Sequence, residues 1–120
     1  MAKFLIVPIG GQTGLTSVTL GNSVTNIGDR AFTLCSSLTN ATLGNSVSTI
    51  GDSAFVDCTS LNSLAIPDSV TTIGVWAFMA CTSLTHATLG NSVTNSGSYA
   101  FVNCTSLTGI TIPDSVIALG

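Results

Sequence analysis

The sequence is built from a unit of 23 residues that recurs with few changes. Each copy begins at a leucine, namely Leu15, Leu38, Leu61, Leu84 and Leu107. Four copies are complete, and the fifth stops at Gly120. A unit of this length cannot bury its apolar side chains alone, so successive copies are expected to stack. We therefore predict one solenoid domain over residues 15–120, preceded by residues 1–14 as a degenerate repeat or an extension.

The first residues of each copy follow the pattern L-x-x-L-x-L, which is typical of leucine-rich repeats. In the first copy, Val18 and Leu20 are apolar and Thr19 lies between them. Apolar residues two positions apart predict a short strand with one buried face. Strands from successive copies are expected to pair into a short parallel sheet along one side of the coil.

The rest of each copy predicts turns around a second extended stretch. The strand is followed by G-N-S-V or P-D-S-V, which are turn-forming residues. Val24 and Ile27 should then pack inward, and Gly28 marks a corner where a side chain would be costly. Asp29 precedes the segment A-F-x-x-C and is expected to cap a short helical or 3₁₀ turn. The predicted fold is a mostly β solenoid with such turns on the far side.

Two residue types recur once per copy after this corner. The phenylalanines should form an aromatic ladder inside the coil: Phe32, Phe55, Phe78 and Phe101. The cysteines share one position of the repeat: Cys35, Cys58, Cys81 and Cys104. Side chains in a ladder point the same way, which favours buried free thiols over disulfides or a metal site. No C-x-x-C motif occurs, and no metal or other cofactor is predicted.

The fourth copy departs from the others at one apolar position. Ser96 stands where the first three copies have isoleucine, namely Ile27, Ile50 and Ile73. If this position belongs to the core, a serine there leaves a hole or a buried polar group. We therefore expect the fourth copy to be locally destabilised.

The charge composition excludes several classes of partner. Charged residues make up 6% of the chain, the net charge is −3, and Lys3 and Arg30 are the only basic residues. So few cations cannot neutralise a nucleic acid or hold an anionic membrane surface. No apolar run is long enough to insert into a bilayer. The opening apolar run is short and interrupted by Pro8, so it is not a convincing signal peptide.

No catalytic site is predicted. The single histidine, His86, should lie on the outward side of the fourth strand, without an acid or nucleophile beside it. The aspartates fall in turns and corners: Asp29, Asp52, Asp57, Asp68 and Asp114. No phosphate loop, nucleophile elbow or zinc signature is present. The chain is therefore predicted not to be an enzyme.

The complete repeat is similar to that of a known family. It reads L-x-x-L-x-[LI]-[GP]-[ND]-S-V-x-x-I-G-x-x-A-F-x-x-C-x-x, and over residues 15–120 it resembles the BspA-like leucine-rich repeat family. The resemblance implies a cell-surface or secreted protein that adheres to other proteins or cells, without catalytic residues. Ser96 and the lack of a recognisable capping module depart from the family pattern. The first hypothesis is a non-catalytic protein-interaction or adhesion module.

Two surfaces are candidates for such an interaction. The first is an apolar patch formed by Val75, Trp76, Met79, Tyr99 and Val102, since residues three apart share a side of a helical turn. Burial of these residues under a terminus is the alternative. The second is the outward sheet face, with Thr19, Asn40, Thr42, Ser63, His86, Thr88 and Thr111. This face suits weak adhesion or, less favourably, ice or glycan binding, and it is otherwise simply solvated.

A second hypothesis is structural. The chain stops mid-repeat, and unpaired end coils expose strand edges that favour further association. The partner is then a second copy, which gives a homo-oligomer or a filament through the uncapped ends or the Trp76/Tyr99 surface.

Overall fold

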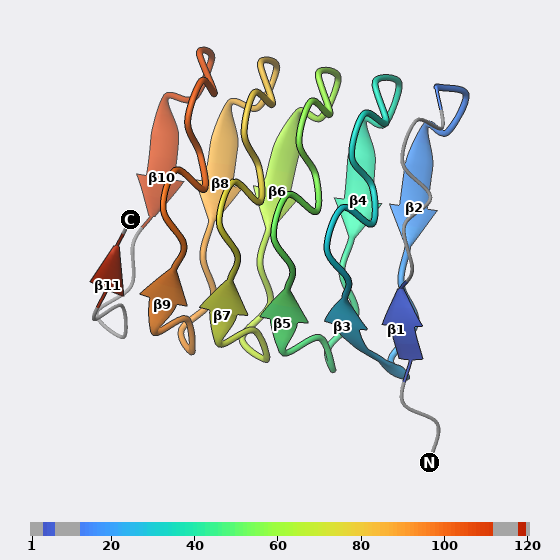
Figure 1. The fold of residues 1–120 in the computed structure, drawn as a ribbon, viewed down its shortest axis with the longest axis vertical. Coiled ribbons are helices and arrows are strands. Elements are labelled where there is room, and N and C mark those ends of the chain that lie inside the picture. Colours follow the sequence, from blue (N-terminus) through green and yellow to red (C-terminus); the bar gives the residue numbers. More distant parts are fainter. Residues whose placement is uncertain (1–3, 7–12, 112–117, 120) are drawn as a thin grey trace.

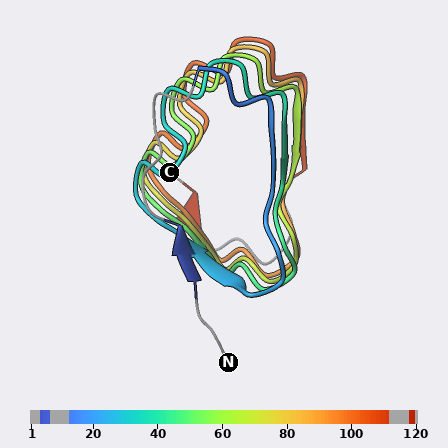
Figure 2. The same ribbon diagram turned by 90° about the vertical axis from the view of Figure 1, so that its right-hand side faces the viewer.

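The computed structural model describes residues 4–6, 13–111 and 118–119 as a coil of short parallel strands (Figure 1). Seen along the axis of the coil, successive turns superpose into one elongated loop (Figure 2). The strands are β1 Phe4–Ile6, β2 Ser17–Thr19, β3 Val24–Ile27, β4 Asn40–Thr42, β5 Thr49–Ile50, β6 Ser63–Ala65, β7 Thr72–Ile73, β8 His86–Thr88, β9 Asn95–Ser96, β10 Gly109–Thr111 and β11 Ala118–Leu119. The predicted solenoid is confirmed.

Two sides of the coil are parallel sheets. The strand predicted at the start of each copy forms β2, β4, β6, β8 and β10, which pair as β2-β4 and β10-β8-β6. The second extended stretch forms the larger sheet, in the order β1-β3-β5-β7-β9-β11. Its register pairs Ile27 with Ile50 and Ile50 with Ile73. One copy of the repeat is therefore one turn of the coil, and equivalent residues form columns.

The third side, which we call the turn side, comprises residues 29–36, 52–59, 75–82 and 98–105. The predicted helical or 3₁₀ turns are not found there, because none of the described residues is helical. Alternate amides instead bond to the next coil, as when Phe32 N donates to Ala54 O over 2.7 Å. The intervening amides close turns, as when Ala31 N donates to Gly28 O over 3.2 Å. Amides shared in this way cannot also bond four residues back as an α-helix requires.

Left-handed residues produce this alternation. Two positions per coil have φ near 60°, and none is a glycine: Arg30, Leu34, Ser53, Asp57, Trp76, Ala80, Tyr99 and Asn103. This conformation costs a non-glycine residue about 1–2 kcal/mol. The packing and hydrogen bonds of the stack must therefore impose it.

The interior consists of the predicted columns. The rings of Phe32, Phe55, Phe78 and Phe101 stack in parallel, with successive centroids 5.2, 5.2 and 5.3 Å apart. Columns of Leu38, Val47, Ile50 and their equivalents surround this ladder and are almost fully buried, except for Leu15 and Leu107 at the ends of the Leu38 column, which are partly buried. Full burial of one such side chain contributes about 1.5–3 kcal/mol. Because each ring packs on rings of the adjacent coils, no coil has a core of its own.

The cysteines form an internal file of buried thiols, as predicted. Cys58 Sγ donates to Phe32 O over 3.2 Å, and Cys81 Sγ donates to Phe55 O over 3.2 Å. Burial, together with the neighbouring Cys35, raises the pKa of Cys58 to about 12. The contact with Cys104, together with burial, likewise raises the pKa of Cys81. Both are therefore neutral hydrophobes and hydrogen-bond donors at physiological pH.

The glycine corners and the aspartates beside them hold adjacent coils together. A Cβ on Gly74 would lie 2.6 Å from Asp52 N and 2.6 Å from Gly51 C, which confirms that a side chain is costly at this corner. The expectation that these aspartates cap a turn of their own copy is wrong, because they bond to a different coil. Asp52 Oδ1 accepts a hydrogen bond from Val75 N, in the next coil, over 2.8 Å. These carboxylates therefore bridge two coils, and the described residues contain no helix that they could cap.

Hydroxyl groups also join the coils. The amide and Oγ1 of Thr39 both donate to Thr16 O, one coil earlier, over 2.8 and 3.0 Å. The same pair of bonds recurs at Ser48, Thr71, Thr85, Thr94 and Thr108. Serine and threonine thus supply hydrogen bonds between coils, which explains how the chain stacks with so few charges.

Ser96 is the single polar residue among the buried described residues. It is 5% exposed, it pairs in register with Ile73, and its Oγ has no hydrogen-bond partner in the described structure. The expectation that this position belongs to the core is confirmed.

Candidate interaction surface

The apolar patch predicted from the sequence lies on the outer surface of the turn side. Trp76 is 47% exposed, Tyr99 is 62% exposed and Val75 is 36% exposed. Met79 and Val102 are half-buried in the same segments of the third and fourth coils. The described residues leave the two aromatic rings open to solvent, so burial under a terminus is not seen in this part of the chain.

The backbone fixes where these aromatic side chains project. Trp76 and Tyr99 occupy equivalent positions of adjacent coils, and each has a φ of 58°. The amide of Trp76 donates to Ser98 O over 3.1 Å, and Met79 N donates to Trp76 O over 3.1 Å. Because the amide and the carbonyl of Trp76 are both hydrogen-bonded, the backbone that carries its side chain is fixed in position. This limits the backbone entropy lost when a partner binds.

The sequence pattern missed two residues of this side. Leu34 is 52% exposed at the second left-handed position of the first coil. The carboxylate of Asp52 contacts the backbone of Val75 and therefore borders the patch directly. Comparison within the column would have indicated Leu34, since the other coils carry Asp57, Ala80 and Asn103 there. No local signal marks Asp52, because its partner is 23 residues away.

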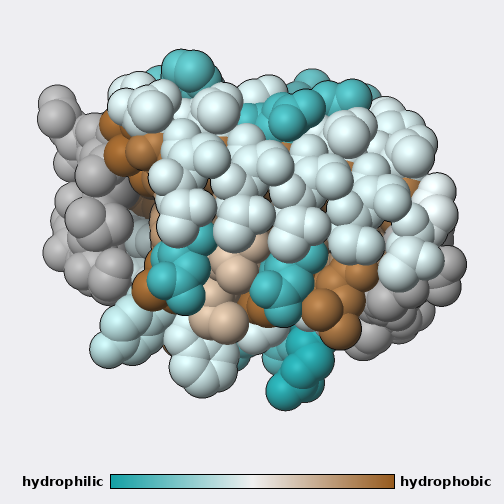
Figure 3. All heavy atoms as spheres, turned by 90° about the horizontal axis from the view of Figure 1, so that it is seen from above, coloured by the Kyte–Doolittle hydropathy of each residue, from teal (hydrophilic) through white to brown (hydrophobic). Residues whose placement is uncertain are grey.

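The sheet face presents small polar side chains in rows. Residues flanking the inward position of each strand point outward, with Thr19 opposite Thr42 and Ser63 opposite His86. The His86 ring bonds Thr85 Oγ1 through Nδ1 over 3.1 Å and lies against Gly109. The rows give a flat polar face without a large aromatic or cationic anchor. Seen from the upper end in Figure 3, the coil is likewise covered mainly by weakly polar side chains, broken by a few apolar ones.

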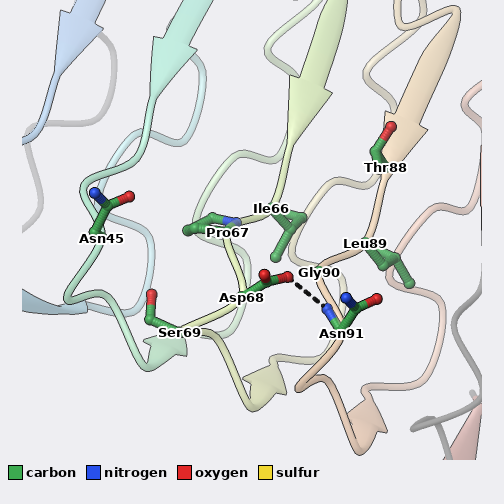
Figure 4. A pocket seen from close by; sticks show the side chains of 9 residues that line it. All are labelled: Asn45, Ile66, Pro67, Asp68, Ser69, Thr88, Leu89, Gly90 and Asn91. Carbon is green, nitrogen blue, oxygen red and sulfur yellow. Dashed lines mark hydrogen bonds between the residues drawn. The ribbon is translucent and has the colours of Figure 1, made fainter.

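An open hollow of about 520 Å³ lies at the turns that follow β6 and β8 (Figure 4). Its lining includes the polar residues Asn45, Asp68 and Asn91 and the apolar residues Pro67 and Leu89. Asp68 Oδ1 accepts a hydrogen bond from Asn91 N over 2.8 Å, so this carboxylate also bridges two coils. No group of three metal-ligating side chains occurs among the described residues.

Comparison with known proteins assigns this repeat architecture to a family. Residues 11–120 match the family model described as BspA type leucine rich repeat region, in six copies. The chain belongs to the BspA-type leucine-rich repeat family. The family resemblance inferred from the repeat is therefore confirmed. The chain matches none of the curated proteins.

Several solved structures, among them leucine-rich repeat proteins, are similar to the chain. A leucine-rich repeat protein of T. pallidum is 30% identical with a TM-score of 0.89, over 99% of this chain and 62% of that protein. A leucine-rich cell surface protein of Faecalibacterium prausnitzii is 33% identical with a TM-score of 0.85, over 91% of this chain and 29% of that protein. The pneumococcal vaccine antigen PcpA, 18% identical with a TM-score of 0.53 over 97% of this chain and 44% of that protein, shares the fold. The chain thus spans less than two thirds of each relative.

Membership of the BspA-type family indicates the class of protein. Such repeats are typically non-catalytic scaffolds that present a surface, which is consistent with a protein-interaction module. No helix in the described part of the chain is long and apolar enough to cross a membrane.

Proposed function

We propose that the chain is a protein-binding, adhesive module of a cell-surface leucine-rich repeat protein and that it binds through the apolar patch of Val75, Trp76, Met79, Tyr99 and Val102. The observation that carries this proposal is the exposure of Trp76 and Tyr99 in adjacent coils. Tryptophan and tyrosine are enriched among the residues that dominate protein interfaces. A surface that is only solvated can be formed by polar side chains, without exposed tryptophan or tyrosine.

The pattern of variation within the repeat supports this choice of surface. Inward columns are nearly uniform, since every complete copy has Ala-Phe and Cys at the same positions. The outward column of the turn side changes completely, from Arg30 and Ser53 to Trp76 and Tyr99. Stacking requires the uniform columns and leaves the outward one free to differ. Specificity of binding is therefore expected in the outward column.

A relative supports a proposal for the location of the protein. The F. prausnitzii protein is named a leucine-rich cell surface protein, and its repeats align with 91% of this chain. We propose the same surface location here. A protein displayed on a cell meets its partners at high local density, so modest affinity per module gives firm adhesion.

The test compares two variants of the purified chain. The Trp76→Ala/Tyr99→Ser variant removes both aromatic anchors, and Thr42→Ala/Thr88→Ala alters the sheet face at two exposed positions. Each protein is immobilised, and the binding of intact cells and of isolated surface proteins is measured. Binding should be lost with the first variant and kept with the second. Equal binding by the unaltered chain and the first variant would contradict the proposal, and loss with the second alone would favour the sheet face.

Self-association is the second candidate function, and the same patch supports it. An exposed pair of aromatic residues can meet its own copy across a two-fold axis. Sedimentation velocity over a range of concentrations distinguishes the two candidates, because a dimer or rod that disappears with Trp76→Ala identifies a second copy as the partner. Assembly through uncapped ends concerns Ile117–Gly120, of which Ile117 and Gly120 lie outside the described residues, and it stays a prediction.

A further inference from the structure

We infer that the partner of the apolar patch is a protein segment that carries a lysine or arginine beside an apolar anchor. This inference rests on the proposed function and specifies the chemistry of its partner. It follows from the residues that border the patch within the first and second coils.

Two carboxylates, those of Asp29 and Asp52, lie in the same column of the stack as Val75 of the patch. Asp29 Oδ1 accepts a hydrogen bond from Asp52 N over 2.8 Å, and Asp52 Oδ1 accepts one from Val75 N over 2.8 Å. Both side chains are exposed. Each bond engages a single oxygen, and an ionised carboxylate has a second oxygen that can accept further hydrogen bonds. The column therefore changes from anionic to apolar between the second and third coils.

The remaining charges of the turn side reinforce this polarity. Asp57 adds a third carboxylate in the second coil, and Arg30 is the single cation among the described residues. Three carboxylates against one guanidinium leave this side negative. Its aromatic members favour the same ligand group, since tryptophan and tyrosine faces attract lysine and arginine. An acidic segment or a nucleic acid would be repelled here.

Charge also disfavours a second copy as the occupant. The chain has five aspartates and only two basic residues, Lys3 and Arg30. Two turn sides that face one another would bring six carboxylates near two guanidinium groups, counting three and one per copy. Like charges across an interface suppress association. A partner that brings its own cations fits the surface better.

The spacing of the coils specifies how the segment lies. Adjacent coils are about 4.8 Å apart, so Asp52 and the aromatic column are separated by about 5–10 Å along the stack. Residues two apart in an extended chain are separated by about 6.6–7 Å. An extended segment that runs along the axis of the coil can therefore place a basic side chain at Asp52 and an apolar one, two residues on, at Trp76 or Tyr99.

Trp76 itself reports on binding, because it is the only tryptophan of the chain. Three short peptides of equal length are compared, each with phenylalanine or leucine two positions after a lysine, a glutamate or a serine, so that both side chains lie on one face of the extended chain. Each is titrated into the intact chain while the emission of Trp76 is followed at low and high salt. The lysine peptide should bind at least about tenfold more tightly than the glutamate peptide, and this difference should shrink at high salt.

Charge-neutral variants isolate the role of the carboxylates. Asp52→Asn/Asp57→Asn keeps an oxygen at each position, so the bond from Val75 N is retained while two charges are removed. The lysine peptide should bind about fivefold more weakly to this variant, as expected for two exposed ion pairs. Asp68→Asn is the control, since it removes one charge from a similar bridge in the turn between β6 and β7, outside the turn side. It should leave binding unchanged.

The outcomes separate this inference from the proposed function. Equal binding of all three peptides, lost with Trp76→Ala, would overturn the basic partner and leave the patch as a binding site. Failure of every peptide to change Trp76 emission would overturn the inference, while binding to cells would still decide the proposed function. A dimer that depends on Trp76 and excludes the lysine peptide would identify a second copy as the occupant.

Discussion

At the scale of single residues, the fold depends on what each column of the stack accepts. The central columns admit only apolar side chains, whereas the left-handed positions of the turn side admit Arg30, Trp76 or Asn103 equally. A residue that violates its column is therefore easy to recognise. Ser96 is the clearest case, because its hydroxyl is buried beside Ile73 without a hydrogen-bond partner.

The change Ser96→Ile should stabilise the protein. It removes an unsatisfied buried hydroxyl, which costs about 1–3 kcal/mol, and restores the apolar column. Urea denaturation of both proteins measures the free energy of unfolding. Ser17→Ile, on the exposed face of β2, is the control and should give no comparable gain. If Ser96→Ile fails to raise the midpoint, the fourth coil packs differently from the first three.

At the scale of elements, neighbouring coils approach so closely that backbone atoms exclude side chains. The corners at Gly51, Gly74 and Gly97 need glycine for this reason, since a Cβ there would overlap the backbone of the preceding coil. Asp29 and Asp52, which follow the corners at Gly28 and Gly51, accept hydrogen bonds from the next coil and not from their own. An element of this fold is therefore defined by its neighbours more than by its local sequence.

The change Gly74→Ala should destabilise the protein markedly. Its Cβ would meet Asp52 N at 2.6 Å and force adjacent coils apart, and overpacking of this kind costs about 1–3 kcal/mol. Gly21→Ala is the matched control, because nothing lies within 4 Å of its Cβ. Thermal unfolding followed by circular dichroism compares the two. Similar melting temperatures would show that the corners are looser than described.

The sequence predicted most of the elements but not their hydrogen bonding. Period and apolar spacing were sufficient for the two extended stretches, the Phe32 ladder and the Cys35 file, because these depend only on which positions face inward. The turn side was assigned helical turns, since A-F-x-x-C after an aspartate is a good local helix start. Bonds between coils overrode that preference. The exposed patch was predictable from Trp76 and Tyr99, whereas its border at Asp52 depends on a contact between copies.

At the scale of the whole molecule, stability belongs to the stack. The phenyl rings, the thiols of Cys58, Cys81 and Cys104, and several threonine hydroxyls find their partners one coil away, so unfolding one coil removes interactions from its neighbours. Few charges contribute to this cohesion. A rise in pH therefore changes the stability of the protein chiefly through the buried thiols, which are neutral in the folded core.

The protein should lose stability as the pH rises above about 9. The pKa of Cys58 is about 12 in the folded chain against an ordinary value of 9.0, so the unfolded state ionises first. The contribution is complete below pH 9 and falls towards pH 12, by about 1.4 kcal/mol per pH unit for one thiol. Cys58→Ser keeps a donor for Phe32 O without a thiol that ionises in this range. Its free energy of unfolding should fall less steeply between pH 9 and 11, and identical slopes would contradict the buried thiol.

The central claim is that equivalent side chains of successive copies form internal columns, which leaves the outward residues for binding. Reaction of the four thiols with a water-soluble disulfide reagent tests this most directly, with and without urea. The account predicts almost no reaction of Cys35, Cys58, Cys81 and Cys104 in the folded chain and complete reaction after unfolding, since all four are buried. Rapid modification of two or more thiols in the folded protein would contradict the stacked columns and the binding surface built on them.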